Sequence, residues 1–372
     1  MIMRAAERLA FIDGWRAVAI LLVFADHLGM NKEIGAFYEQ SAIGVVSQYG
    51  ETGVFIFFFI SGYVVSLTAL REVAATGGFS APAFYARRFF RIAPPLTLYL
   101  GALAALGLAG LIDVSAENIV SAALYLCNST APGASCNWYV GHTWSLAFEE
   151  QFYCLFPLAF AWSALGKAPR PALAAAALAF AALPFVFTVW WIGKIGCVVA
   201  YGLFSAGWAA AKQGGAIEAL FQNWRTPALA LAALIVFAPR SVVAAFGADE
   251  AARAELIAWY RLAYVGAIPV LVLLSGAAGG VLRKLLSIGV VGALGRASYS
   301  VYLWQQLCNG PIFSDLGAAE QVALLAGTIL FCLGLFRIEL RVIGLGQALS
   351  RRFQRREDAE AAPSAVAIGP AH

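Results

Sequence analysis

Long apolar segments recur along the whole chain, with short polar segments between them. A helix that crosses a bilayer needs about 17–25 mostly apolar residues. The pattern therefore predicts an all-α integral membrane protein, a bundle of about ten transmembrane helices. The predicted spans are residues 10–29, 45–69, 93–111, 143–163, 171–191, 194–211, 226–246, 260–278, 297–313 and 318–336.

Two of these spans are weakly defined, and one end of the chain carries no span. Only Trp191–Lys194 separates the fifth span from the sixth, and polar residues interrupt the ninth. We predict one membrane domain over residues 1–345 and a cytoplasmic, disordered tail over 346–372, because the end of the chain is rich in Ala and acids and has no apolar period. No internal repeat and no second soluble domain is visible.

Basic residues alternate with the predicted spans. The loops that share a side with the N-terminus hold clearly more Lys and Arg than the opposite loops. Cytoplasmic loops carry this excess, so both termini are expected in the cytoplasm. Arg4 and Arg8 precede an apolar run without a small-residue cleavage site, so the N-terminus does not resemble a cleavable signal.

Composition supports a lipid environment and argues against other classes. Hydrophobic residues make up 61% of the chain and charged residues 12%, about half the charged share of soluble domains. The net charge of +4 comes with basic residues in short clusters, which argues against nucleic-acid binding. The six cysteines form no metal-ligand pattern, and no metal is expected. Cys127 and Cys136 share a polar stretch, where a disulfide is plausible if that stretch is extracytoplasmic.

The first predicted helix carries Asp13, Arg16, Asp26 and His27. Charged residues inside a span are costly and by default mark a functional or buried polar site. Arg16 and His27 are eleven residues apart, which returns the same helical face about 16 Å along the axis. The plainer alternative is that Arg16 extends to the lipid headgroups and His27 caps the helix.

The fourth predicted helix opens with a second polar cluster. Ser145, Glu149 and Tyr153 repeat every four residues and share a face. We expect Glu149 to point into the bundle at a depth similar to that of His27, where the two could meet. A histidine beside a carboxylate in a water-poor site can take a proton from a hydroxyl. A buried ion pair that only joins two helices is the alternative.

A third cluster, Arg88 and Arg91, lies three residues apart at the predicted cytoplasmic mouth of the third helix. An anchor for lipid phosphates explains it most simply, whereas a clamp for an anionic cytosolic ligand is the functional alternative. On packing grounds, Ser61-Gly62 is assigned to a close approach of helices.

Five sequence patterns then occur in a specific order from Phe11 to Glu339. They are Arg-x10-His at Arg16 and His27, Gly-Val with Phe-Phe and Ser-Gly-Tyr at 53–63, Arg-x-x-Arg at Arg88 and Arg91, Trp-Ser-Leu-x-x-Glu-x-x-Phe-Tyr at 144–153, and Ser-Tyr-Ser-x-Tyr-Leu-Trp at 298–304. Together they resemble the membrane acyltransferase 3 family, and the resemblance covers most of the chain.

The resemblance implies O-acylation, usually O-acetylation, of an extracytoplasmic saccharide or lipid-linked sugar, with acyl-CoA (acetyl-CoA) as the donor from the cytosol. It places the protein among the lipids of the bacterial cytoplasmic (inner) membrane. Many members continue the last motif with a histidine, where Gln305 stands here, so His27 is the main candidate base. Some members carry an esterase-like SGNH domain after the membrane domain, and from the length of the sequence we expect none here.

These roles give a set of expected site residues. His27 and Glu149 are expected to be catalytic, and Arg16, Arg88 and Arg91 to bind acyl-CoA. Substrate contacts are expected at Asp13, Ser61, Trp144, Ser145, Tyr153 and Tyr302. General-base catalysis and a covalent acyl-His both remain open.

Two other classes of protein also remain open. A transporter or flippase of a lipid-linked sugar would place the same polar residues along a pathway, and a scaffold for polymer assembly would need none of them. Acceptor specificity is expected to depend on the outer loops 31–44, 112–141 and 247–260.

Overall fold

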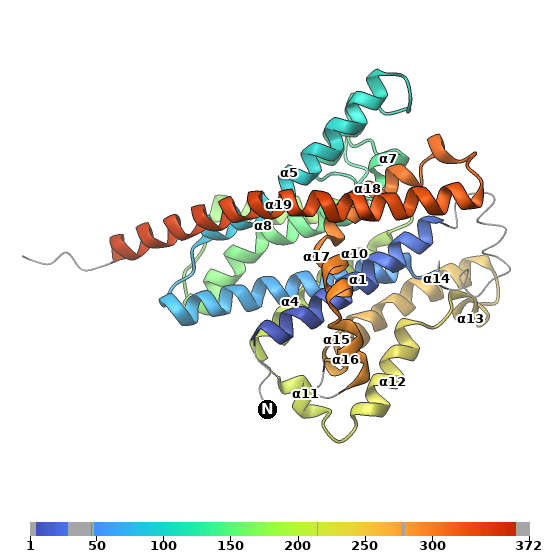
Figure 1. The fold of residues 1–372 in the computed structure, drawn as a ribbon. Helices are drawn as coiled ribbons and strands as arrows, with labels where there is room; N and C mark the ends of the chain where they lie inside the picture. The colour runs from blue at the N-terminus through green and yellow to red at the C-terminus, as the bar shows by residue number, and fades with distance from the viewer. Residues whose placement is uncertain (1–4, 29–45, 47, 214, 277–279, 362–372) are drawn as a thin grey trace, which may run out of the picture.

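The computed structural model describes residues 5–28, 46, 48–213, 215–276 and 280–361, and most of these residues are helical (Figure 1). The first half holds α1 (Ala5–Leu28), α4 (Gly50–Thr76), α5 (Ala81–Leu108), α6 (Ala116–Ala123), α7 (Trp138–Gly141), α8 (Trp144–Leu165), α9 (Pro171–Val186) and α10 (Gly193–Gln213). The second half holds α11 (Ala216–Leu220), α12 (Arg225–Val236), α13 (Arg240–Ala244), α14 (Glu250–Tyr260), η1 (Arg261–Ala263), α15 (Tyr264–Ser275), α16 (Val281–Leu286), α17 (Gly289–Arg296), α18 (Ser298–Cys308), η2 (Pro311–Phe313) and α19 (Ala318–Ala361).

Five helical segments among the described residues are long and apolar enough to cross a membrane: Gly50–Thr76, Ala81–Leu108, Gly193–Gln213, Glu250–Ser275 and Ala319–Arg355. Large hydrophobic side chains such as Leu98, Leu234 and Leu330 are exposed on the flanks of the bundle. Exposed apolar surface on this scale is typical of a contact with lipid. The all-helical, membrane-type fold is therefore confirmed, while the count of about ten spans stays a prediction.

The core is centred on α4, whose aromatic residues Phe55, Phe58 and Phe59 are fully buried. Helix α10 packs directly on it, because Gly62 and Gly207 let the two backbones approach. The close helix contact predicted at Ser61-Gly62 is therefore confirmed for the glycine.

A methyl group at this contact should destabilise the bundle. A Cβ at Gly207 would lie 2.5 Å from Phe59 O and from Tyr63 N, and overpacking of this kind costs about 1–3 kcal/mol. We expect Gly207→Ala to lower the thermal unfolding temperature in detergent. Gly101→Ala is the matched control, because a Cβ at Gly101 meets nothing within 4 Å. An unchanged unfolding temperature for Gly207→Ala would contradict this packing.

Helix α19 differs from the predicted disordered tail. It continues through residue 345 to Ala361, and Gly346 packs against the Phe90 side chain. Ser350 accepts a hydrogen bond of 2.5 Å from Arg87 on α5. The Ala, Arg, Gln and Glu residues of this segment also have high helix propensity. The structure thus gives a helix over residues 346–361, and residues 362–372 lie outside the described residues.

Candidate active site

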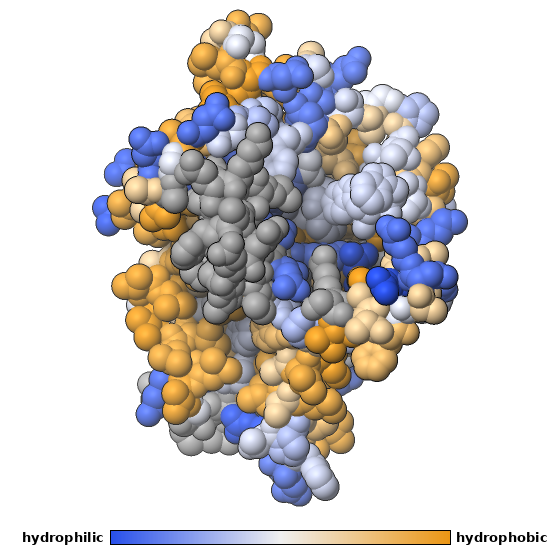
Figure 2. All heavy atoms as spheres, turned by 90° about the vertical axis from the view of Figure 1, so that its right-hand side faces the viewer, coloured by the Kyte–Doolittle hydropathy of each residue, from blue (hydrophilic) through white to orange (hydrophobic). Residues whose placement is uncertain are grey.

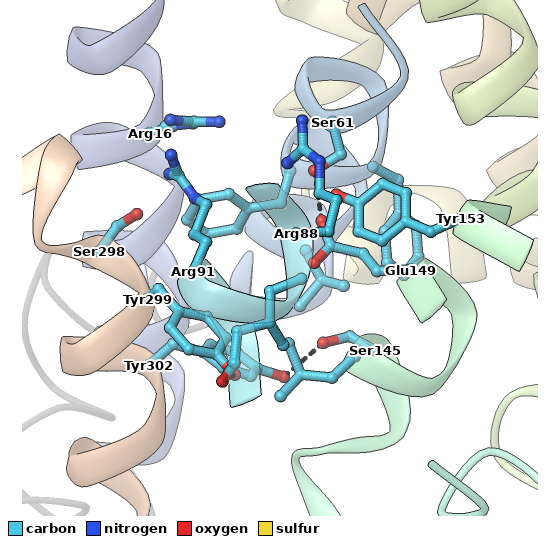
Figure 3. Close-up of a pocket in the computed structure, with 15 residues that line it drawn as sticks. Arg16, Ser61, Arg88, Arg91, Ser145, Glu149, Tyr153, Ser298, Tyr299 and Tyr302 are labelled. Atoms are coloured by element: carbon cyan, nitrogen blue, oxygen red, sulfur yellow. Dashed lines mark hydrogen bonds between the residues drawn. The ribbon is translucent and has the colours of Figure 1, made fainter. Parts of the chain in front are cut away.

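A narrow cavity of about 70 Å³ lies inside the bundle, between α1, α4, α5, α8 and α18 (Figure 3). We call it the inner cavity. Its polar lining residues are Arg16, Ser61, Arg88, Arg91, Ser145, Glu149, Tyr153, Ser298, Tyr299 and Tyr302. A water molecule occupies about 10–15 Å³ on this scale, so the cavity admits a thin group and not a nucleotide.

Three arginines converge on the inner cavity from α1 and α5 (Figure 3). Arg16 lies 3.7 Å from Asp13, and the Arg88 guanidinium lies 4.9 Å from the centre of the Tyr153 ring. Among the described residues, neither Arg88 nor Arg91 forms an ion pair within 4.0 Å. Guanidinium groups with no carboxylate at ion-pair distance in such a cavity are suited to bind an anion such as a phosphate.

Glu149 supplies the carboxylate of the inner cavity, where it accepts a hydrogen bond from the Ser61 hydroxyl. The predicted shared face of Ser145, Glu149 and Tyr153 is confirmed, since all three line this cavity. The neighbouring Glu150 lines neither this cavity nor the second one described below. Glu149 therefore acts as the local counter-charge to the arginines.

A second, larger cavity of about 810 Å³ opens at the end of the bundle that holds the C-terminus of α1. We call it the outer cavity. Figure 2 looks onto this end, where hydrophilic side chains gather around a hollow and hydrophobic residues cover much of the flanks. His27, Asp26, His142, Trp144 and Glu51 are among the lining residues, and Glu51 pairs with Arg261 at 2.9 Å.

His27 lies in the outer cavity with one ring nitrogen available. Its ring packs edge-on against Trp138, with centroids 5.8 Å apart, and the Val23 backbone and the Gln305 side chain lie near the imidazole. Nδ1 is buried and has no partner. The glutamine that stands where many members have a histidine therefore lies beside His27.

His142 is a feature to which the sequence analysis gave no role. It precedes α8, is 4% exposed, and neither of its ring nitrogens has a partner. Burial lowers the pKa of His142 to about 3, with a smaller contribution from nearby His27. The ring is therefore neutral at physiological pH, so one of its nitrogens can donate a hydrogen bond and the other can accept one. The chain has three histidines, and this scarcity was the feature of the sequence that could have indicated a role for His142.

Tyr302 separates the two cavities. Together with Val54 it lines both of them. Its hydroxyl lies 2.7 Å from Ser145 Oγ and donates to the His142 carbonyl. The inner and outer cavities are thus neighbours that share a wall of two side chains.

The structure groups the expected site residues differently from the prediction in two places. Glu149 and His27, expected to meet, line different cavities. Asp13 lines neither cavity and instead lies 3.7 Å from Arg16 and 3.6 Å from Arg296. Trp144 lies in the outer cavity with His27. The inner cavity brings together Arg16, Ser61, Arg88, Arg91, Ser145, Glu149, Tyr153 and Tyr302.

A disulfide, which the sequence left open, joins Cys127 and Cys136, and both cysteines line the outer cavity. Among the described residues, no three His, Cys, Asp or Glu side chains gather in a way that could hold a metal ion.

These features define a helical membrane-type protein with a buried arginine cluster adjoining a histidine-containing cavity. The family model described as an acyltransferase domain matches residues 9–337, and the chain belongs to this acyltransferase 3 family. The resemblance inferred from the motifs is therefore confirmed.

Curated relatives share part of the chain. This chain is 31% identical to a Staphylococcus aureus (strain COL) protein named "Putative O-acetyltransferase". The alignment extends over 157 residues, which are 40% of this chain and 24% of the relative. Over the same extents this chain is 28% identical to "O-acetyltransferase OatA" of Staphylococcus aureus (strain NCTC 8325 / PS 47). The match thus spans about a quarter of these relatives' length. No solved structure matches the chain.

Proposed function

We propose that this protein is an O-acyltransferase that moves an acyl group, most simply acetyl, from acyl-CoA to a hydroxyl of an extracytoplasmic saccharide. The family match carries the proposal, and the names of the O-acetyltransferase relatives support transfer to oxygen. The neighbouring arginine and histidine cavities support it independently, since a phosphorylated donor and a hydroxyl acceptor need sites of different chemistry.

The proposed setting is the bacterial cytoplasmic membrane, with about ten spans and both termini in the cytoplasm. Besides the five membrane-length segments, the apolar helices Pro171–Val186 and Arg225–Val236 support further passes. In this orientation Arg88 and Arg91, near the start of α5, face the cytoplasmic side and the outer cavity faces the opposite side. The basic loops support the same direction.

Acyl-CoA would place its phosphates at Arg16, Arg88 and Arg91. Because the inner cavity is narrow, only the thin pantetheine arm and its thioester would pass toward Val54 and Tyr302. The nucleotide would remain outside it.

His27 would act on the acceptor in the outer cavity. Its unpartnered Nδ1 would take the proton of an acceptor hydroxyl. The hydroxyl oxygen would then form a bond to the thioester carbonyl carbon. The C–S bond would break, and the departing CoA thiolate would receive the proton. Transfer through a covalent acyl-His is the variant of this route.

The donor site is tested by calorimetry of acetyl-CoA with the full chain in detergent. We expect Arg88→Ala combined with Arg91→Ala to weaken binding by about a hundredfold, because hydrogen bonds to charged groups contribute about 1.5–3 kcal/mol each. Arg71→Ala is the matched control, since Arg71 is exposed on α4 and lines neither cavity.

Equal affinity in the double variant and the wild type would exclude this donor site. A folded wild-type protein that binds no short acyl-CoA would exclude the donor itself. A protein that moves a lipid-linked sugar across vesicles without acylating it would be a transporter instead.

A further inference from the structure

The connection between α9 and α10 carries two tryptophans that the proposed mechanism does not use. Trp190 and Trp191, with Val189, line the outer cavity that holds His27. Trp190 is 89% exposed and Trp191 is 38% exposed. Two adjacent, accessible indole rings thus border a cavity whose interior contains hydrogen-bonding side chains.

This connection has a fixed position. Thr130 N donates to Phe187 O at 2.8 Å, and Ser129 pairs with Thr188 as an isolated antiparallel bridge. The Cys127–Cys136 disulfide closes the loop on the other side of that bridge. The tryptophans are therefore attached to a braced pair of loops.

Trp191 also packs inside the cavity wall. Its ring meets Trp144 edge-on, with centroids 5.1 Å apart. Edge-to-face pairs of this kind contribute about 0.5–1.5 kcal/mol beyond area burial. Trp144 precedes Ser145, which the Tyr302 hydroxyl contacts at 2.7 Å. The aromatic lining therefore continues to the wall between the two cavities.

The polar lining complements the indole rings. His142 presents two ring nitrogens without partners at 4% exposure, and Nδ1 of His27 has no partner either. A binding cavity usually combines aromatic walls with a few placed polar groups. A pyranose ring matches this set, because its C–H face is apolar while its hydroxyls form a polar rim. The electron-rich face of an indole attracts such C–H groups.

We propose that Trp190 and Trp191 form the acceptor subsite, where a neutral pyranose unit of the glycan stacks and directs one hydroxyl to His27 while His142 bonds a second hydroxyl. This inference rests on the proposed O-acyltransferase function. An anchor in the membrane interface, where tryptophan is enriched, is the competing role, and it predicts no effect on acceptor affinity.

The test measures transfer kinetics with the full chain in detergent and [14C]acetyl-CoA. The acceptor probe is the unacetylated surface glycan extracted from host cells that lack the gene. We expect Trp190→Ala and Trp191→Ala each to raise KM for this glycan about tenfold, with kcat little changed, since the lost contact binds ground state and transition state alike. Trp190→Phe and Trp191→Phe, which keep an aromatic face, should restore most of the affinity.

Trp162→Ala and Trp224→Ala are the matched controls, because both tryptophans are exposed and line neither cavity. Their KM for the glycan should equal that of the wild type. If the wild type acetylates the glycan but both alanine variants at 190 and 191 keep its KM, the subsite is excluded and the proposed function stands. If the folded wild type binds acetyl-CoA and transfers nothing to the glycan, the proposed function fails and this subsite with it.

Discussion

Replacement of His27 by glutamine is expected to reduce acetyl transfer by about a hundred- to ten-thousandfold, the contribution typical of a positioned general base. The amide can occupy the place of the imidazole and still meet Gln305, but it cannot take a proton from a hydroxyl. His27 lines the outer cavity and is absent from the lining of the inner one. Affinity for acetyl-CoA should therefore stay at the wild-type value.

The measurement pairs [14C]acetyl transfer to the glycan with calorimetry of acetyl-CoA on the same preparation. Retained donor binding shows that the variant is folded and separates a chemical defect from a structural one. Normal transfer by a folded His27→Gln protein would exclude both the general base and the acyl-His route. If the variant loses both donor binding and acetyl transfer, His27 supports the structure of the inner cavity instead.

The sequence was sufficient to predict which residues of one helix share a face. Spacing alone placed Ser145, Glu149 and Tyr153 on one face of α8, and all three line the inner cavity. Helical periodicity fixes such relations without knowledge of the fold. The family resemblance had the same basis, because its motifs are local strings of residues.

Relations between helices were less accessible. Because Glu149 and His27 were expected at a similar depth, the two side chains were expected to meet. Instead, Ser61 and the arginines surround the carboxylate of Glu149. Gln305 lies near the imidazole of His27. Depth along a bundle does not determine which helix faces which. Tyr302 and Val54 separate the two groups, and no spacing rule predicts a shared wall.

The connection at 187–192 shows a further limit of sequence patterns. The sequence analysis placed residues 187–191 inside the fifth span, with a weak boundary at Trp191–Lys194, and gave the tryptophans no role. Its position depends on pairing with residues 129–130, far away in the chain. Helix α19 presents the converse case, since a polar segment remains helical because α5 offers Arg87 and Phe90 as partners.

Glu149→Gln is the second substitution expected to have a large effect, because it removes the carboxylate that balances the arginines of the inner cavity. The amide retains the size of the side chain and can still accept from Ser61. Without the negative charge, like charges in a buried space repel one another and the guanidinium groups separate. We expect transfer to fall by about a hundredfold, or about 2.7 kcal/mol in activation free energy.

Donor affinity distinguishes this role from direct binding of acyl-CoA. Loss of an anion makes the cavity more positive, so acetyl-CoA should bind Glu149→Gln as tightly as the wild type or more tightly. Glu149→Ala should also lower the unfolding temperature, since removal of one partner from a buried charge cluster costs about 3–5 kcal/mol. Glu150→Gln is the matched control at the adjacent position, because Glu150 lines neither cavity. Equal transfer rates for Glu149→Gln and Glu150→Gln would show that the charge of Glu149 has no part in the reaction.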